Sequence, residues 1–136
     1  GAVEELDAEL TSVSSSLTQK GSYTSSDATS STSVTNATVT EVSSLELTSG
    51  VYILIGCADW KGNTTGFRQI SFATVTNPSR DRCVTTPALN DSSKELYQQV
   101  CCLVTPSQTT TFKLYAYPNC GSALTVYPVI RAIKLS

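Results

Sequence analysis

Acidic residues are the side chains in this sequence that are best suited to chemistry, yet their spacing does not assemble a catalytic site. A glycosidase would need paired carboxylates, for which the candidates are Asp59, Asp81, Asp91 and Glu95. No motif brings two of these residues together. The chain has no His, so a Ser-His-Asp triad cannot form and a zinc site of the usual kind is not expected. We therefore predict a protein that is not an enzyme, with no catalytic residue, no metal site and no cofactor.

Five cysteines are the next reactive group: Cys57, Cys83, Cys101, Cys102 and Cys120. An odd number cannot pair completely within one chain. Because Cys101 and Cys102 are adjacent, a strand would point them to opposite faces. One interpretation is that the thiols are buried and act as small apolar groups. The other is one or two disulfides, with Cys83 and Cys120 as the first candidate pair.

Two clusters combine aromatic and polar residues in the way a saccharide site does, with a ring for stacking and a carboxylate or amide for hydroxyls. Asp59, Trp60, Asn63 and Arg68 could form the first cluster at the end of a strand. In the alternative interpretation Trp60 closes the core and Arg68 makes a surface ion pair with Asp59.

The second candidate cluster is formed by Tyr115, Tyr117 and Asn119. Its alternative interpretation is packing at an interface between subunits.

Residues 1–20 have the heptad pattern of a coiled-coil stem. Val3, Leu10 and Leu17 fall at position a, and Leu6 and Val13 at position d. The segment is too short to be stable as an isolated helix, so it needs a partner. Leu at a with a β-branched residue at d favours three or four helices over two. The alternative is one amphipathic helix lying on its own domain.

The rest of the chain divides into a Ser/Thr-rich segment and a head. Residues 21–33 have almost nothing to bury, which predicts a linker or an extended strand on the surface of the head. From residue 34 to 136, short segments rich in Thr, Val and Tyr alternate with Gly, Pro, Asn and Ser turns, which predicts an all-β sandwich. The expected strands are 37–42, 50–60, 66–74, 81–86, 96–104, 110–117, 124–127 and 129–135.

Charge and hydropathy exclude two classes of partner. The net charge is -2, and a nucleic-acid surface needs clustered Lys and Arg. No apolar run is long enough to cross a bilayer. By contrast, residues 51–55 and 129–135 are apolar on both faces of their strands, which indicates contact between subunits.

The order of strands and loops in the head resembles a known family. A Gly-led apolar strand at 50–60 precedes Asn63-Thr-Thr-Gly66-Phe-Arg68, and a Gly-Ser-Ala-Leu loop at 121–124 precedes a last strand with Ile-x-Ala-Ile-x-Leu at 130–135. This succession resembles the C-terminal head domains of phage and prophage tail proteins. Those heads are jelly rolls of the same general shape as C1q and tumour-necrosis-factor domains.

The resemblance implies a jelly-roll homotrimer at the tip of a viral tail fibre or baseplate, assembled in the bacterial cytoplasm. The implied partners are two further copies of the chain, other tail or fibre components, and a saccharide or protein on the host surface. Two alternatives remain open. One is a purely structural domain that trimerises or caps a fibre. The other is a secreted carbohydrate-binding or adhesion module, whose compartment would oxidise the cysteines to disulfides.

Overall fold

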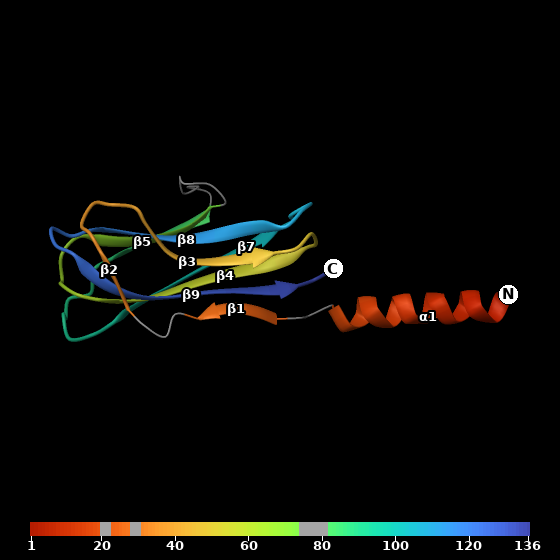
Figure 1. The fold of residues 1–136 in the computed structure, drawn as a ribbon. Helices are drawn as coiled ribbons and strands as arrows, with labels where there is room; N and C mark the ends of the chain where they lie inside the picture. The colour runs from red at the N-terminus through yellow and green to blue at the C-terminus, as the bar shows by residue number, and fades with distance from the viewer. Residues whose placement is uncertain (20–22, 28–30, 74–81) are drawn as a thin grey trace.

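The computed structural model describes residues 1–19, 23–27, 31–73 and 82–136. In these parts of the chain a single helix precedes nine strands (Figure 1). The elements are α1 (Ala2–Gln19), β1 (Tyr23–Asp27), β2 (Thr32–Val34), β3 (Thr40–Leu47), β4 (Tyr52–Lys61), β5 (Phe67–Ala73), β6 (Cys83–Pro87), β7 (Leu96–Val104), β8 (Thr110–Asn119) and β9 (Leu124–Lys134).

The strands form two antiparallel sheets that pack face to face. Sheet A has the order β1-β9-β4-β7, with β2 also pairing with β9, and sheet B has the order β3-β8-β5-β6. The chain crosses between the sheets at most connections, so neighbours in a sheet are distant in sequence. The predicted all-β sandwich with an N-terminal helix is confirmed, and this strand order fits a jelly roll.

The last strand is longer than the sequence predicts. Segments 124–127 and 129–135 were expected as two separate strands, with Pro128 between them. In the structure they form the single strand β9. β2 pairs with β9 up to Val126 and β1 pairs with it from Val129, so Pro128 lies at the gap between these two partners.

The segment 21–33 contains strands in its described parts. β1 and β2 pair with β9 along one edge of sheet A, which agrees with the surface-strand interpretation of this segment. The sandwich therefore begins at Tyr23 and not at residue 34. The strand predicted over 37–42 starts later, at Thr40, because Asn36 and Ala37 form a turn in which Ala37 has a positive φ of 54°.

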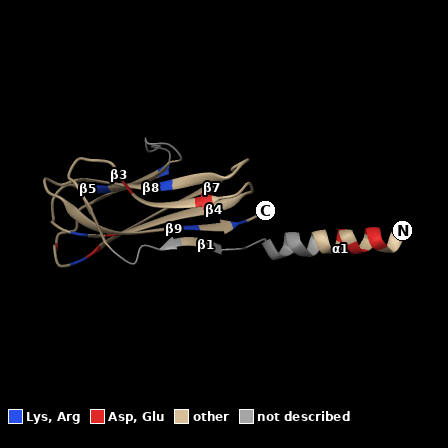
Figure 2. Ribbon diagram, in the orientation of Figure 1, with Lys and Arg blue, Asp and Glu red and all other residues tan. Residues whose placement is uncertain are grey.

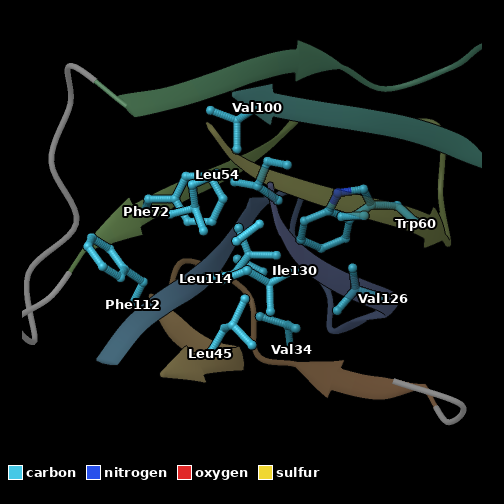
Figure 3. Packing of buried hydrophobic residues seen from close by; sticks show 14 of the residues in the cluster. Val34, Leu45, Leu54, Trp60, Phe72, Val100, Phe112, Leu114, Val126 and Ile130 are labelled. Carbon is cyan, nitrogen blue, oxygen red and sulfur yellow. The ribbon is translucent and has the colours of Figure 1, made fainter. Parts of the chain in front are cut away.

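A hydrophobic core fills the space between the sheets (Figure 3). Its largest fully buried side chains include Trp60 and Leu54 from β4, Phe72 from β5 and Leu114 from β8. Fully burying one such side chain contributes about 1.5–3 kcal/mol. Gly56 lies opposite Phe72 and Leu114, where an added Cβ would come within 2.8 Å of both side chains.

The helix α1 projects away from the sandwich and leaves its apolar seam in solvent (Figure 1). Val3, Leu6 and Leu10 are 81%, 67% and 65% exposed. The interpretation of α1 as a helix lying on its own domain is therefore wrong for residues 1–12, all of which are exposed. The side chains of Val13 and Leu17 lie outside the described part of the chain. No helix among the described residues has the length and apolar character needed to span a membrane.

We predict that Gly66→Ala destabilises the sandwich by at least about 3 kcal/mol, because an added Cβ would lie 1.9 Å from the carbonyl oxygen of Asn119. Gly121→Ala is the matched control. Gly121 also has a positive φ, 82° against 68° at Gly66, but no atom within 4 Å of the added Cβ. It should cost only the backbone strain of about 1–2 kcal/mol. Urea unfolding of both variants checks this, and equal losses would contradict the steric explanation.

Candidate functional site

The loops at the end of the sandwich opposite α1, called here the distal end, are tied together by Asn63 and Arg68. Arg68 Nη1 donates to the carbonyl of Thr65 (2.7 Å), and Nη2 donates to the carbonyl and Oδ1 of Asn63 (2.7 and 3.1 Å). Asn63 Nδ2 donates in turn to the carbonyl of Cys120 and to Ser122 Oγ. These contacts join the loop after β4 to the loop after β8.

Asn36 attaches a third loop to the same region. Its Oδ1 accepts hydrogen bonds from the backbone N–H groups of Cys120 and Gly121, both at 2.9 Å. The N–H of Ala37 donates to the carbonyl of Pro118. Polar side chains thus satisfy the backbone groups of the distal loops, which would otherwise remain unpaired where the loops approach the core.

Trp60 lies inside the core, next to this network. It is 1% exposed, and its Nε1 donates to Gln98 Oε1 at 2.7 Å. Gln98 Nε2 donates to the carbonyl of Arg68 and to Thr86 Oγ1. The interpretation that Trp60 closes the core is confirmed, and its ring offers no open face for a sugar.

A shallow open pocket lies at the distal end, with room for about one water molecule. It is bordered by three of the four residues in the first predicted cluster and by a loop before β7. Its lining residues are Trp60, Gly62, Asn63, Arg68, Leu89, Asp91, Lys94 and Leu96.

Asp59, the fourth residue of that cluster, faces away from the pocket. Side chains alternate along β4, so Asp59 lies on the outer face of sheet A, in register with Tyr97 and Tyr127 on the neighbouring strands. The predicted ion pair between Asp59 and Arg68 is wrong, because Arg68 lies on the core side of β5 and bonds to neutral oxygens.

Electrostatics on that outer face depend on Asp59 and its neighbour Glu95. Burial, and secondarily the charge of Glu95, raises the pKa of Asp59. Glu95 forms an ion pair with Lys61 at 2.9 Å, and this hydrogen bond raises the pKa of Lys61. Tyr97 donates to Cys57 Sγ at 3.1 Å, which raises the pKa of Tyr97 to about 12.

Of the four candidate carboxylates, the structure brings Asp59 and Glu95 near each other, but neither borders the distal pocket. Asp91 borders it and accepts hydrogen bonds from the N–H and Oγ of Ser93, which lower its pKa. Asp81 lies outside the described residues. Within the described ranges no three of His, Cys, Asp and Glu gather into a group that could hold a metal ion.

The second predicted cluster lies on the outer face of sheet B. Tyr115 is buried, Tyr117 is half-buried and Asn119 is exposed. The rings of Tyr117 and Phe67 are 6.0 Å apart and inclined by 37°. The three residues share one face of β8 but differ in accessibility, and ligand binding there stays a prediction.

None of the five cysteines forms a disulfide. Cys101 is exposed and Cys102 is half-buried, as their adjacent positions on a strand predict. The suggested pairing of Cys83 with Cys120 is wrong. Cys83 is level with Ser71, whereas Cys120 follows Asn119, which is level with Phe67 at the other end of β5. That separation exceeds the Cα distance of about 4.4–6.8 Å that a disulfide spans.

Sequence reasoning missed two residues at the distal end: Gln98, which belongs to the network, and Lys94, which borders the pocket. Gln98 is 2% exposed and lies on the core side of β7, between Leu96 and Val100. Alternation along that strand places a glutamine in the core, so a buried polar contact could have been anticipated. Nothing in the sequence brings Lys94 next to Arg68, because the loop that carries it has no motif.

Comparison with known proteins gives little further information. No family model matches the chain, and no curated protein matches it. A solved structure from Bacillus endospore appendages, described as a novel family of disulfide-linked pili, is similar at 12% sequence identity. The match covers 86% of this chain and 94% of that chain with a TM-score of 0.44. A similarity at this level does not place the chain in a family.

We predict opposite pH effects for Asp59→Asn and Asp91→Asn. The pKa of Asp59 is raised, so its carboxylate opposes folding once the pH exceeds that pKa. Asp59→Asn should therefore stabilise the protein at pH 7, and this gain should fade as the pH falls toward the usual value of 3.8. The pKa of Asp91 is lowered, so Asp91→Asn should destabilise the protein at pH 7 and lose its effect in acid.

Urea unfolding of wild type and both variants between pH 3 and pH 7 checks this pair of predictions. Effects of the same sign at pH 7 would contradict them.

Proposed function

We propose that this chain is the self-assembling, trimeric head at the end of a fibre, and that its first role is structural. One observation carries the proposal. The chain leaves apolar surface uncovered both on α1 and on the outer face of sheet A. Contiguous apolar surface that is exposed to water is typical of a site of contact with another molecule.

The stem supplies the first uncovered surface. The described side chains of α1, at residues 1–12, are all exposed, and a helix of this length on its own is marginal in water. Val3, Leu6 and Leu10 lie on one side of α1 at heptad spacing, and all three are more than 60% exposed. Packing them against copies of the same helix would bury this seam and stabilise it, and Leu10 at position a favours three or four chains.

The outer face of sheet A supplies the second uncovered apolar surface. Leu103 and Tyr97 on β7 are 59% and 56% exposed, and Tyr127 on β9 is 36% exposed. Ile53 and Ile55 on β4 are half-buried on the same face. An antiparallel sheet that covers a core on one side normally presents polar residues on the other.

Sheet B shows the usual pattern and serves as an internal comparison. Its outer face has an ion pair between Lys113 and Glu41 at 3.2 Å and a hydrogen bond between Gln69 and Thr85. Charged residues lie on strands of both sheets and in the distal loops (Figure 2), and on the outer face of sheet A they include Asp59 and Lys61. The two outer faces differ in their large apolar side chains, because Tyr97, Leu103 and Tyr127, the exposed ones on the described strands, all lie on sheet A.

The connection between stem and sheet favours a joint interface. α1 leads into β1, which is the edge strand of sheet A (Figure 1). Helices that associate through their seam would therefore bring the sheet A sides of their heads together. With the resemblance to heads of phage and prophage tail proteins, this supports a fibre tip in a virion. Attachment to a host saccharide is placed second, since Trp60 and Arg68 are buried.

We predict that the full chain has three times its single-chain mass of 14.4 kDa in solution, measured by light scattering. A version that starts at residue 22 should keep the sandwich but associate more weakly, because it lacks the seam of α1. A monomeric full chain at high concentration would contradict the proposal.

Matched surface variants locate the interface. Leu10→Lys and Leu103→Lys should each shift the protein toward monomer, since a lysine would have to be buried between chains. Val39→Lys is the control, because Val39 is 42% exposed but lies on neither proposed surface. If Val39→Lys lost assembly as much as Leu10→Lys and Leu103→Lys do, the two proposed contact surfaces would be wrong.

A further inference from the structure

The outward edge of strand β7 carries backbone groups that no described strand pairs with. β7 is the last strand of sheet A, and its nine residues pair with β4 from Tyr52 to Trp60 without a register shift. In an antiparallel ladder, alternate residues direct their N–H and C=O groups away from the partner strand. Along β7 these groups form an edge to which a further strand can bond.

Edge strands normally have features that prevent pairing with another chain, such as charges, prolines, bulges or a short length. Three of the four edges of the described sheets have such features. In sheet B, β3 carries Glu41 and Glu46 and has a bulge between Glu41 and Ser43. The other edge strand of that sheet, β6, has five residues and ends at Pro87. On the far edge of sheet A, β1 and β2 have only five and three residues.

β7 has none of these protective features. It is nine residues long and contains no charged residue and no proline. The four side chains on its outer face are all exposed, namely those of Tyr97, Gln99, Cys101 and Leu103. A long and regular edge strand without charges is the type that pairs with another strand.

A second copy of β7 fits this edge. In an antiparallel pair centred on Val100, Tyr97 of each chain lies opposite Leu103 of the other. These are the most exposed large apolar side chains on the described strands, at 56% and 59%, and such a pair covers both of them twice. An uncharged strand also meets its own copy without repulsion between like charges. A copy of β3, by contrast, would bring further glutamates into the same ladder.

We propose that two heads associate by antiparallel pairing of β7 with β7, which joins their sheets A into one continuous sheet. This contact has a two-fold axis, so it links chains of two different trimers and goes beyond the trimeric head proposed above. The edge lies at the side of sheet A, so its backbone groups stay accessible when the outer face is covered. β7 is also at the opposite edge from β1, into which α1 leads (Figure 1). The two contacts are therefore compatible.

Gln99→Lys tests the pairing close to its centre. Gln99 is exposed, so the fold should be unaffected, but in this register the two lysines lie diagonally across the two-fold axis and repel each other. Thr85→Lys is the matched control, because Thr85 is an exposed residue of the edge strand β6 in sheet B. Light scattering of the full chain should give a mass above three times 14.4 kDa as the protein concentration rises. Gln99→Lys should need about tenfold more protein for the same rise, and Thr85→Lys should match wild type.

Hydrogen exchange of single backbone amides separates edge pairing from packing of the sheet faces. At high protein concentration, the outward N–H groups of β7 should exchange more slowly than at low concentration, because pairing bonds them. Packing of outer faces would leave these N–H groups without a partner strand. The amides at the edge of β3 should exchange equally at both concentrations. Unchanged exchange in β7, or equal slowing in β3, overturns the proposal.

Leu10→Lys keeps this inference separate from the trimeric head. Its stem no longer assembles, yet its mass should still rise with concentration, and the added change Gln99→Lys should remove that rise. A wild type that never forms a trimer but shows a rise suppressed by Gln99→Lys contradicts the trimeric head alone. A wild-type trimer whose mass stays constant with concentration, or equal effects of Gln99→Lys and Thr85→Lys, overturns the β7 pairing alone.

Discussion

Burial of side chains between the two sheets is the interaction on which the rest of this structure depends. β4 lies between β9 and β7 and contributes Leu54 and Trp60 to the core, while Phe72 and Leu114 meet them from sheet B. The hydrophobic effect has no direction, so it brings the sheets together without fixing their register. Register follows from alternation, because a slip by one residue would turn these side chains out to solvent.

The same alternation determines what the molecule presents to its surroundings. Residues on β4 that do not enter the core, such as Ile53 and Ile55, must lie on the outer face of sheet A. With Leu103 they form an apolar surface there, whereas Lys113 and Glu41 make the outer face of sheet B polar. One face is therefore suited to contact with another protein surface and the other to water. The uncovered seam of α1 adds to this asymmetry.

The distal end follows a different physical rule. There the chain turns sharply between sheets, and its backbone groups need partners that regular pairing does not supply. Asn36, Asn63 and Arg68 provide them, and Gln98 links this network to Trp60. The consequence is a hydrogen-bonded cluster that holds Arg68 between the loops and the core.

The sequence by itself determined the class of fold and most of its strands, because turn residues and alternating apolar positions are local properties. It also identified the heptad seam at Val3, Leu6 and Leu10, and it indicated that Cys101 and Cys102 point to opposite faces. What only the tertiary structure decided is which partners lie across the sheets and loops. Strand β9 runs through Pro128 because one strand, β2, pairs with β9 before this proline and another, β1, pairs with it afterwards. Cys83 and Cys120 lie too far apart to form a disulfide. Asp59 lies on the outer face of sheet A, whereas Arg68, close to it in sequence, lies on the core side of sheet B. No motif predicts that Arg68 and Lys94 border the same pocket, since contacts between distant segments depend on how the whole core packs.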